Sequence, residues 1–287
     1  MFRPITITLE MIKFQHTVFA LPFALLAAFT AANGVPDLRT LLWILVAMAG
    51  ARSAAMAFNR LVDAPIDAKN PRTAGRALPA GEVSRQFVAL FTVASAGALI
   101  LAAWELNPLA FYLSPVALLI VFGYSFTKRF TSLSHLFLGL SLGVAPIGAW
   151  IAVSGTIDPR VFLLGAGVLF WTAGFDVLYS LQDLGFDRRS GLHSIPVRIG
   201  PAAALGVARL FHVVTVGCLV AFGILASFGI LYYVGVAAAV GLLIWQHSLV
   251  TPTDISRIDA AFFTANGILS IVLFVFGAVD ILMRSHP

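Results

Sequence analysis

The sequence predicts an all-α membrane protein, a polytopic bundle of about nine transmembrane helices around a central cavity. The 287 residues are 60% hydrophobic and only 11% charged, which leaves too few charges to cover a water-soluble domain. Apolar stretches long enough to cross a bilayer recur along the whole length. No polar segment is long enough for a second domain, so residues 1–287 are expected to form a single transmembrane domain.

The expected spans follow from hydropathy and from the short Pro- or Gly-bearing turns between them. They cover residues 15–33, 38–60, 85–104, 108–127, 135–153, 159–180, 201–226, 229–249 and 259–283. Two longer, more charged connections follow the second and sixth spans, at residues 61–86 and 181–200. Because four spans separate them, both connections are expected on the same side of the membrane.

The distribution of Lys and Arg sets the expected orientation. With a cytoplasmic N-terminus, all but three of the 18 Lys and Arg lie toward the cytoplasmic side, and the exceptions are Arg39, Arg160 and Arg284. This bias follows the positive-inside rule and accounts for the net charge of +5 without a nucleic-acid partner. We therefore expect a bacterial-type inner-membrane protein whose charged connections face the cytoplasm.

Each long connection begins with aspartates spaced by four residues. The first series is Asn59, Asp63 and Asp67, and the second is Tyr179, Asp183 and Asp187. On a helix this spacing stacks the side chains on one face. Pro65 and Gly185 predict that each helix frays or ends within its motif.

Stacked carboxylates at a membrane surface repel one another and need a cation. Mg²⁺ binds carboxylate oxygens together with substrate phosphates, so the two motifs favour a site in which Mg²⁺ joins the protein to a diphosphate. The alternative is that the acids form ion pairs with nearby cations in solvated loops. In the metal-site interpretation, nearby basic side chains would bind the diphosphate charge that Mg²⁺ does not neutralise. These are Lys69, Arg72, Arg76, Lys128 and Arg129.

Other polar residues lie within or beside the spans. Arg52 precedes Asn59 by seven residues, so it is expected on the same face, in an ion pair or in contact with an acidic substrate. Asp176 precedes Asp183 by the same interval and could orient a ligand or pair with Arg52. His16 and Asn266 are candidates either for substrate contact or for hydrogen bonds between helices.

These motifs carry a resemblance to a known family. The sequence resembles the UbiA superfamily of membrane prenyltransferases over nearly its whole length, including the expected number of helices. The matching features are the Asn59–Asp63–Asp67 series, the pair Asp183 and Asp187, the run NPRTAGRALPAG at residues 70–81, and YSFTKR at residues 124–129.

The resemblance implies transfer of a polyprenyl group from an allylic prenyl diphosphate to an aromatic acid in respiratory quinone biosynthesis. It implies that four aspartates hold Mg²⁺ as the catalytic set, with Asn59 assisting: Asp63, Asp67, Asp183 and Asp187. Diphosphate would be bound by Arg72, Arg76, Lys128 and Arg129. Arg52 and His16 are the candidates for the acceptor, Asp176 for ligand orientation, and Tyr124 and Tyr179 for stabilising a carbocation with their ring faces. An aspartate is the expected base for the ring proton.

The acceptor stays open between two rings. Many relatives that prenylate 4-hydroxybenzoate have an acidic residue after the first Asn, where this sequence has Arg60. Together with the opening KFQHTVFALPFAL, this resembles the menaquinone branch, whose acceptor is 1,4-dihydroxy-6-naphthoate. Haem, chlorophyllide or glycerol phosphate acceptors remain alternatives within the family.

A secondary transporter is the alternative from another class, but transporter sites usually lie near the bilayer midplane rather than at one surface. The expected partners are the two substrates and membrane lipid, and the oligomeric state stays open.

Overall fold

The computed structural model describes residues 7–8, 11 and 17–285. All regular secondary structure in this part of the chain is helical. The α-helices are α2 (Thr17–Ala32), α3 (Leu38–Asp67), α4 (Arg85–Leu106), α5 (Pro108–Thr127), α6 (Ser134–Ser154), α7 (Pro159–Tyr179), α8 (Leu184–Arg189), α9 (Ile195–Ile199), α10 (Pro201–Leu225), α11 (Ile230–Ser248) and α12 (Ala265–Ser285). A 3₁₀ turn, η2 (Ser180–Asp183), follows α7, and a π-helical turn, η3 (Ala260–Thr264), precedes α12.

Eight helical segments of the described chain are long and apolar enough to cross a membrane. The remaining expected span, residues 15–33, corresponds to α2, an apolar helix of 16 residues, which extends about 24 Å at the usual helical rise. The expectation of an all-α membrane protein is confirmed. Large apolar side chains such as Leu90, Leu119 and Ile244 are exposed on these helices, as they are on helices that face lipid.

The first motif is expected to fray or end its helix, and α3 does end at Asp67, the last residue of the motif, but it continues past Pro65. Proline lacks the N–H that would bond to the carbonyl four residues earlier, here that of Leu61. Arg85 Nη2 lies 3.5 Å from Leu61 O and supplies a donor to this carbonyl. The helix therefore continues, and all three polar residues of the first motif lie on α3.

The second motif does interrupt its helix, but earlier than Gly185. The α-helical geometry ends at Tyr179, passes through η2 and resumes in α8, which contains Gly185. Ser180 Oγ donates to Val177 O at 2.9 Å, a local bond that competes with the backbone ladder at this point. The change of pitch lies between Tyr179 and Asp183, so the second series does not keep a single helical face.

The chain forms two compact units. Unit 1 comprises Met1–Thr17 and Arg39–Phe126, and unit 2 comprises Val18–Leu38 and Thr127–Pro287. The expectation of a single domain stays a prediction. In the described part, unit 1 holds α3, α4 and α5, and unit 2 holds α2 and α6 to α12.

In unit 1, small and aromatic residues bring α3 next to its neighbours. A Cβ atom at Gly50 of α3 would lie 2.9 Å from Ser95 O of α4, so only glycine permits this approach. Phe58 of α3 packs on Phe122 of α5, with ring centroids 4.5 Å apart. These contacts fix the helix that carries the first acidic motif.

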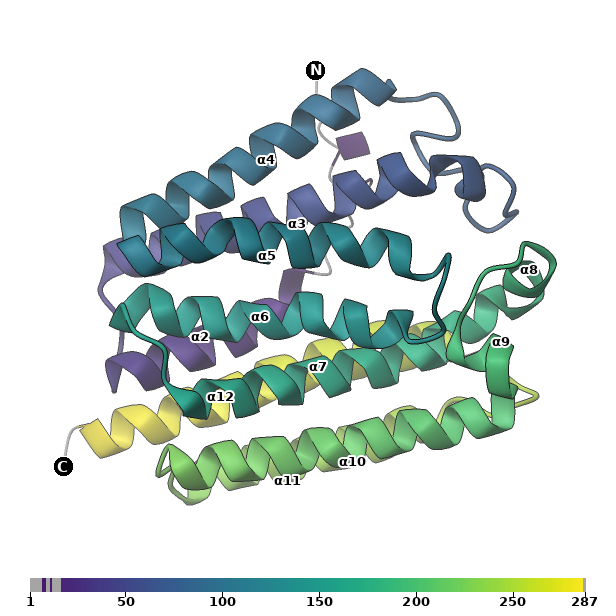
Figure 1. Cartoon of the computed structure of the whole chain (residues 1–287). Coiled ribbons are helices and arrows are strands. Elements are labelled where there is room, and N and C mark those ends of the chain that lie inside the picture. The colour runs from purple at the N-terminus through teal and green to yellow at the C-terminus, as the bar shows by residue number, and fades with distance from the viewer. Residues whose placement is uncertain (1–6, 9–10, 12–16, 286–287) are drawn as a thin grey trace. The chain divides into compact units, whose positions relative to one another are not determined.

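In unit 2, α7 packs against both α6 and α10, and Figure 1 shows these three helices running side by side. Gly139 and Gly143 of α6 form a Gly-x-x-x-Gly contact with α7, where a Cβ atom at Gly143 would lie 2.6 Å from Gly165 O. The helix α11 packs on α12. The helix α2 meets α7 where Phe23 and Trp171 bring their ring centroids to 5.0 Å. The helix that carries the second acidic motif is thus central to its unit.

Candidate active site

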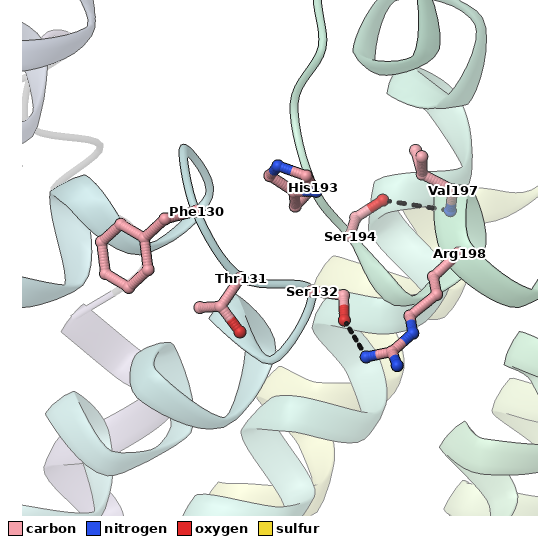
Figure 2. A pocket seen from close by; sticks show the side chains of 7 residues that line it. All are labelled: Phe130, Thr131, Ser132, His193, Ser194, Val197 and Arg198. Atoms are coloured by element: carbon pink, nitrogen blue, oxygen red, sulfur yellow. Dashed lines mark hydrogen bonds between the residues drawn. The ribbon is translucent and has the colours of Figure 1, made fainter.

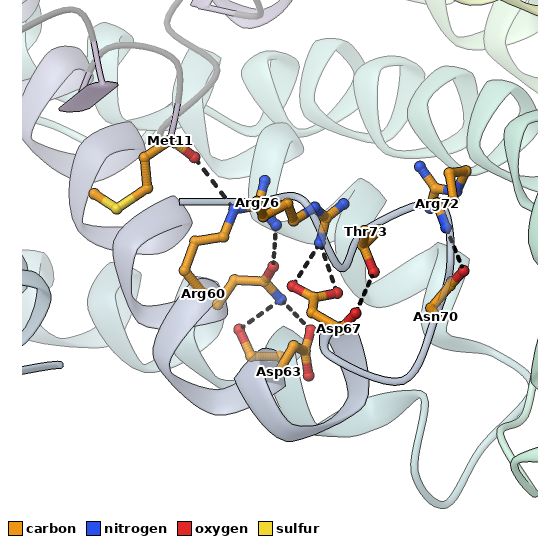
Figure 3. A network of polar contacts seen from close by, with 10 residues as sticks. Met11, Arg60, Asp63, Asp67, Asn70, Arg72, Thr73 and Arg76 are labelled. Atoms are coloured by element: carbon orange, nitrogen blue, oxygen red, sulfur yellow. Dashed lines mark hydrogen bonds and ion pairs between the residues drawn. The ribbon is translucent and has the colours of Figure 1, made fainter. Parts of the chain in front are cut away.

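The first acidic cluster lies at the end of α3 and is shown in Figure 3. Asn59 Nδ2 donates to Asp63 Oδ2 at 2.8 Å, one helical turn further along. Asn59 Nδ2 also lies 3.4 Å from Ser125 Oγ on α5. The predicted stacking of Asn59 and Asp63 on one face of a helix is therefore confirmed.

Asp67 is buried, and an arginine from the following loop binds its carboxylate. Arg76 Nη1 lies 2.8 Å from Oδ1 and 2.7 Å from Oδ2 of Asp67. Thr73 Oγ1 donates to Asp67 O, and the Arg72 N–H donates to Asn70 Oδ1. The loop after α3 is thus folded back onto the motif, and it brings two of the predicted diphosphate-binding arginines to the same end of the helix.

Arg60, the residue that departs from the usual family pattern, is buried behind the cluster. Its Nε donates to Met11 O at 3.2 Å, and its Nη1 lies 3.5 Å from Asn59 Oδ1. The guanidinium thus connects the N-terminal segment to the first residue of the motif (Figure 3). Arg60 has a structural partner on either side of it, which accounts for a buried cation at this position.

Arg52 lies further into α3 and is half-buried. Tyr124, another of the predicted site residues, lies on α5. The Nε of Arg52 is buried without a hydrogen-bond partner among the described residues. A buried guanidinium that has an unused donor is suited to an acidic group of a ligand. His16, the other candidate for the acceptor, lies outside the described residues.

The second acidic cluster lies beyond the end of α7. Asp187 is 1% exposed, and its Oδ2 lies 2.8 Å from Lys128 Nζ. Lys128 and the exposed Arg129 belong to the short loop between α5 and α6. Asp183 is buried in η2, one residue before α8 begins. Asp67 and Asp187 thus each form an ion pair with a nearby cation, but both carboxylates are buried and do not lie in solvated loops.

Asp176 has a partner that the sequence did not predict. Its Oδ2 lies 2.7 Å from Nδ1 of His135, a residue of α6 that is 2% exposed. The Ile195 N–H donates to His135 Nε2 at 3.3 Å, so Nε2 is the acceptor and Nδ1 carries the hydrogen that bonds Asp176. Asp176 is thus oriented by a histidine that also holds the start of α9.

A cavity of about 330 Å³ lies in unit 2, and its lining begins at Phe130, two residues after Lys128 along the chain (Figure 2). The His193 N–H donates to Lys128 O at 2.8 Å, which joins the cavity wall to the loop that carries the cation. Arg198 Nη1 donates to Ser132 Oγ at 3.3 Å across the cavity. No carboxylate lies among the residues that line it: Phe130, Thr131, Ser132, His193, Ser194, Val197 and Arg198. Guanidinium and hydroxyl groups bind phosphate oxygens well, so the chemistry of the cavity suits an anion.

Tyr179 lies in a cluster of aromatic rings. Its ring centroid is 4.2 Å from that of Phe262 and 6.4 Å from that of Phe263, both in η3. Phe262 also meets Phe19 of α2 at 5.6 Å and Phe175 of α7 at 5.2 Å. Aromatic rings gathered at the end of α7 are able to stabilise a developing cation with their faces.

In each unit, a helix or the segment after it carries an aspartate that is paired with a basic side chain, Arg76 in unit 1 and Lys128 in unit 2. No group of three His, Cys, Asp or Glu side chains that could hold a metal ion occurs among the described residues. Sequence reasoning missed His135, Ser132 and Arg198. A histidine within an apolar run is a signal for an intramembrane carboxylate partner and could have pointed to His135, whereas Ser132 and Arg198 gave no signal of their own.

Comparisons with known proteins bear on the family of the chain. The sequence profile of the UbiA prenyltransferase family matches residues 20–268. The 4-hydroxybenzoate octaprenyltransferase of Nitrosomonas europaea is 31% identical over 255 residues, which cover 89% of this chain and 87% of the relative. A solved UbiA homologue from Aeropyrum pernix K1 superposes with a TM-score of 0.81 at 31% identity, and the match covers 94% of this chain and 98% of that one.

A second solved structure shares the fold at lower identity. The UbiA homologue from Archaeoglobus fulgidus, bound to GPP and Mg²⁺, matches with a TM-score of 0.77 at 20% identity, covering 96% of this chain and 99% of that one. The family profile and the relative from Nitrosomonas extend over most of the sequence and include both acidic motifs. The chain therefore belongs to the UbiA prenyltransferase family.

Proposed function

We propose that the protein transfers a polyprenyl group from an allylic prenyl diphosphate to the ring of an aromatic acid in respiratory quinone biosynthesis. The observation that carries the proposal is the pair of acidic helix ends, each with a bound cation: Asp67 with Arg76 and Asp187 with Lys128. The curated relative that acts on 4-hydroxybenzoate makes this ring the first acceptor to test. The second acceptor to test is 1,4-dihydroxy-6-naphthoate, because the buried Arg60 stands where many relatives that prenylate 4-hydroxybenzoate have an acidic residue.

We propose that Mg²⁺ is held by the four motif aspartates, Asp63, Asp67, Asp183 and Asp187, with Asn59 assisting. Hard oxygen ligands at these positions fit the ion, and a homologue with the same fold binds GPP and Mg²⁺. When bound, the ion neutralises charge on the departing diphosphate. Arg76 and Lys128 already lie against Asp67 and Asp187 and are therefore in place to bind diphosphate oxygens, together with Arg72 and Arg129.

In the proposed reaction, the bond between the first prenyl carbon and the diphosphate oxygen breaks, and positive charge develops on that carbon. The ring carbon next to the phenol of the acceptor attacks it, and a carboxylate takes the displaced ring proton. The rings of Tyr179 and Tyr124 face the charge, while the apolar helices exclude the water that would capture the cation. Arg52, with its buried free Nε, and His16 are the proposed contacts of the acid group of the acceptor.

The cavity of unit 2 is proposed to receive part of the diphosphate. Its chemistry complements a phosphate anion, because Arg198, His193 and Ser132 line it without any carboxylate. The hydrogen bond from the His193 N–H to the Lys128 carbonyl joins this wall to the backbone of the residue whose side chain pairs with Asp187. Asp176, which is held by His135, is proposed to orient groups at the same end of α7.

The first test is an assay on membranes that contain the protein, with a long-chain prenyl diphosphate and Mg²⁺ and with each of the two acceptors supplied separately. Prenylation of one ring, lost on addition of EDTA and restored by Mg²⁺, would establish the reaction and name the acceptor. Product that forms equally in EDTA would exclude the metal. If neither ring is consumed, haem, chlorophyllide and glycerol phosphate acceptors become the candidates.

A further inference from the structure

The last transmembrane segment does not begin as a regular α-helix. Residues Ala260–Thr264 form the π-helical turn η3, and the α-helix α12 follows at Ala265. A π-turn fits one additional residue into the helix and leaves backbone carbonyls without their usual donors. Such turns are rare, cost stability and occur frequently at functional sites.

Two buried amide side chains supply donors to this turn. Gln246 of α11 donates from Nε2 to Ala261 O at 2.7 Å. Asn266 donates from Nδ2 to Phe262 O at 2.8 Å and lies 3.5 Å from Ala261 O. Gln246 is 1% exposed and Asn266 is not exposed at all. The expected bond of Asn266 to another helix is thus replaced by a bond within its own segment, and Gln246 provides the bond between helices.

The two amides lower the stability of the fold, and their packing does not explain why they are present. Gln246 Oε1 and Asn266 Oδ1 are both buried without a hydrogen-bond partner among the described residues. An unsatisfied buried acceptor typically costs about 1–3 kcal/mol. A regular helix with apolar residues at both positions would avoid this cost. The amides are therefore best explained by what the π-turn does to the side chains that it carries.

The turn brings Phe262 onto Tyr179. The two ring centroids are 4.2 Å apart with an interplanar angle of 34°. Tyr179 is the last residue of α7, and η2 with Asp183 follows directly. A shift of Phe262 would therefore displace Tyr179 at the junction of α7 and η2, next to Asp183.

We infer that Gln246 and Asn266 are positioning residues, whose amides hold the π-turn η3 so that Phe262 fixes Tyr179 and the end of α7. The inference rests on the proposed function, because it assigns the consequence of this positioning to prenyl transfer at the second acidic motif. The amides act through Phe262 and touch no substrate.

The test compares Gln246→Met, which keeps the size of the side chain and removes the donor, with Gln86→Met at the exposed start of α4. We expect Gln246→Met to lower kcat/KM for prenyl transfer on the order of tenfold, and Gln86→Met to leave it unchanged within about twofold. Asn266→Leu is the second variant, with the same expected loss, in case one replacement prevents folding. Activity is expressed per amount of folded protein. If the amides only stabilise the fold, this normalised activity would not change in the variants.

A double-mutant cycle then decides whether the amide acts through Phe262. Adding Gln246→Met to a Phe262→Ala protein should cause less than about a twofold further loss, because the group that it positions is already absent. Losses that multiply, on the order of tenfold in both backgrounds, would overturn the inference.

A readout independent of turnover separates this inference from the proposed function. A fluorotyrosine introduced at position 179 should show a ¹⁹F resonance that moves in Gln246→Met and in Phe262→Ala but not in Gln86→Met. An unmoved resonance in Gln246→Met would refute the positioning, whatever the activity. A protein that shows these shifts but transfers no prenyl group to any acceptor would refute the proposed function and leave the positioning of Tyr179 in place.

Discussion

Asp63 and Asp67 lie one helical turn apart on α3, but their surroundings differ. Asp63 accepts a hydrogen bond from a neutral amide, that of Asn59, whereas Asp67 is buried against the guanidinium of Arg76. In the second motif, Asp187 has the corresponding cation, Lys128. Each motif thus contains a carboxylate that forms an ion pair with a protein cation. A divalent metal would add further positive charge at these carboxylates.

Replacing one motif aspartate by asparagine should therefore abolish most of the activity. We expect Asp63→Asn and Asp183→Asn to lower the rate of prenyl transfer by on the order of 100-fold or more, because each loses a negative oxygen ligand but keeps its size. The assay is product formation by purified protein in lipid with saturating Mg²⁺.

Asp158→Asn is the matched control for this loss. Asp158 caps the opposite end of α7, where its hydrogen bonds with Arg160 hold the pKa of its carboxyl below the usual value. Asparagine is also a good N-cap residue, so this variant should keep its activity. Full activity in Asp63→Asn or Asp183→Asn would remove that residue from the metal site.

Arg198 allows a separate test of the cavity of unit 2. Arg198→Leu should raise the inhibition constant of inorganic diphosphate on the order of tenfold, since one charge-assisted hydrogen bond is lost. Arg209→Leu, an exposed arginine of α10 that does not line the cavity, is the control. Equal inhibition constants in the wild type and in Arg198→Leu would show that diphosphate does not bind in this cavity.

At the scale of elements, the position of α7 depends on glycines of α6. In lipid, helices gain little from apolar burial and associate through close packing, so a missing Cβ atom allows an approach that no other residue permits. A Cβ atom at Gly143 would lie 2.6 Å from Gly165 O, whereas one at Gly148, on the same helix, would meet nothing within 4 Å. The two glycines form a matched pair.

Gly143→Ala should lower the thermal stability of unit 2 and reduce activity, because overpacking of this kind typically costs about 1–3 kcal/mol. Gly148→Ala should leave the melting temperature unchanged or raise it, since alanine favours the helix. The measurement is the melting temperature of the detergent-solubilised protein, together with the activity that remains. Equal melting temperatures in the two variants would contradict the close α6–α7 contact.

At the scale of the whole molecule, the excess of Lys and Arg on one set of loops predicts that the acidic motifs face the cytoplasm. Single cysteines in a Cys218→Ser background test this orientation. In sealed right-side-out vesicles, a membrane-impermeant maleimide should label Thr156→Cys, between α6 and α7, and should not label Ser190→Cys, beyond α8. The reverse pattern would invert the proposed topology.

The sequence by itself determined the class of fold and the positions of most helices. Two helix ends differ from the prediction by more than two residues, the end of α3 and the start of α12, which follows η3 at Ala265, and helical structure continues beyond α7 through η2 into α8. The other ends of the helices that correspond to predicted spans lie within two residues of the predicted ones. Lipid explains this accuracy, because backbone groups in a bilayer must be satisfied within a helix, so hydropathy alone marks the segments. The contact between Asn59 and Asp63 could also be predicted from the sequence, since side chains four residues apart are neighbours on any helix.

Only the tertiary structure decided what each polar side chain contacts. His135 meets Asp176 across 41 residues of sequence and Ile195 across 60. Gln246 reaches Ala261 only because α11 packs on α12 and the latter begins with a π-turn. The carbonyl of Leu61 receives a donor from Arg85 of α4, which allows α3 to continue past Pro65. Periodicity describes neighbours along one helix, whereas these contacts depend on how separate helices pack, and that is settled by side-chain shape in three dimensions.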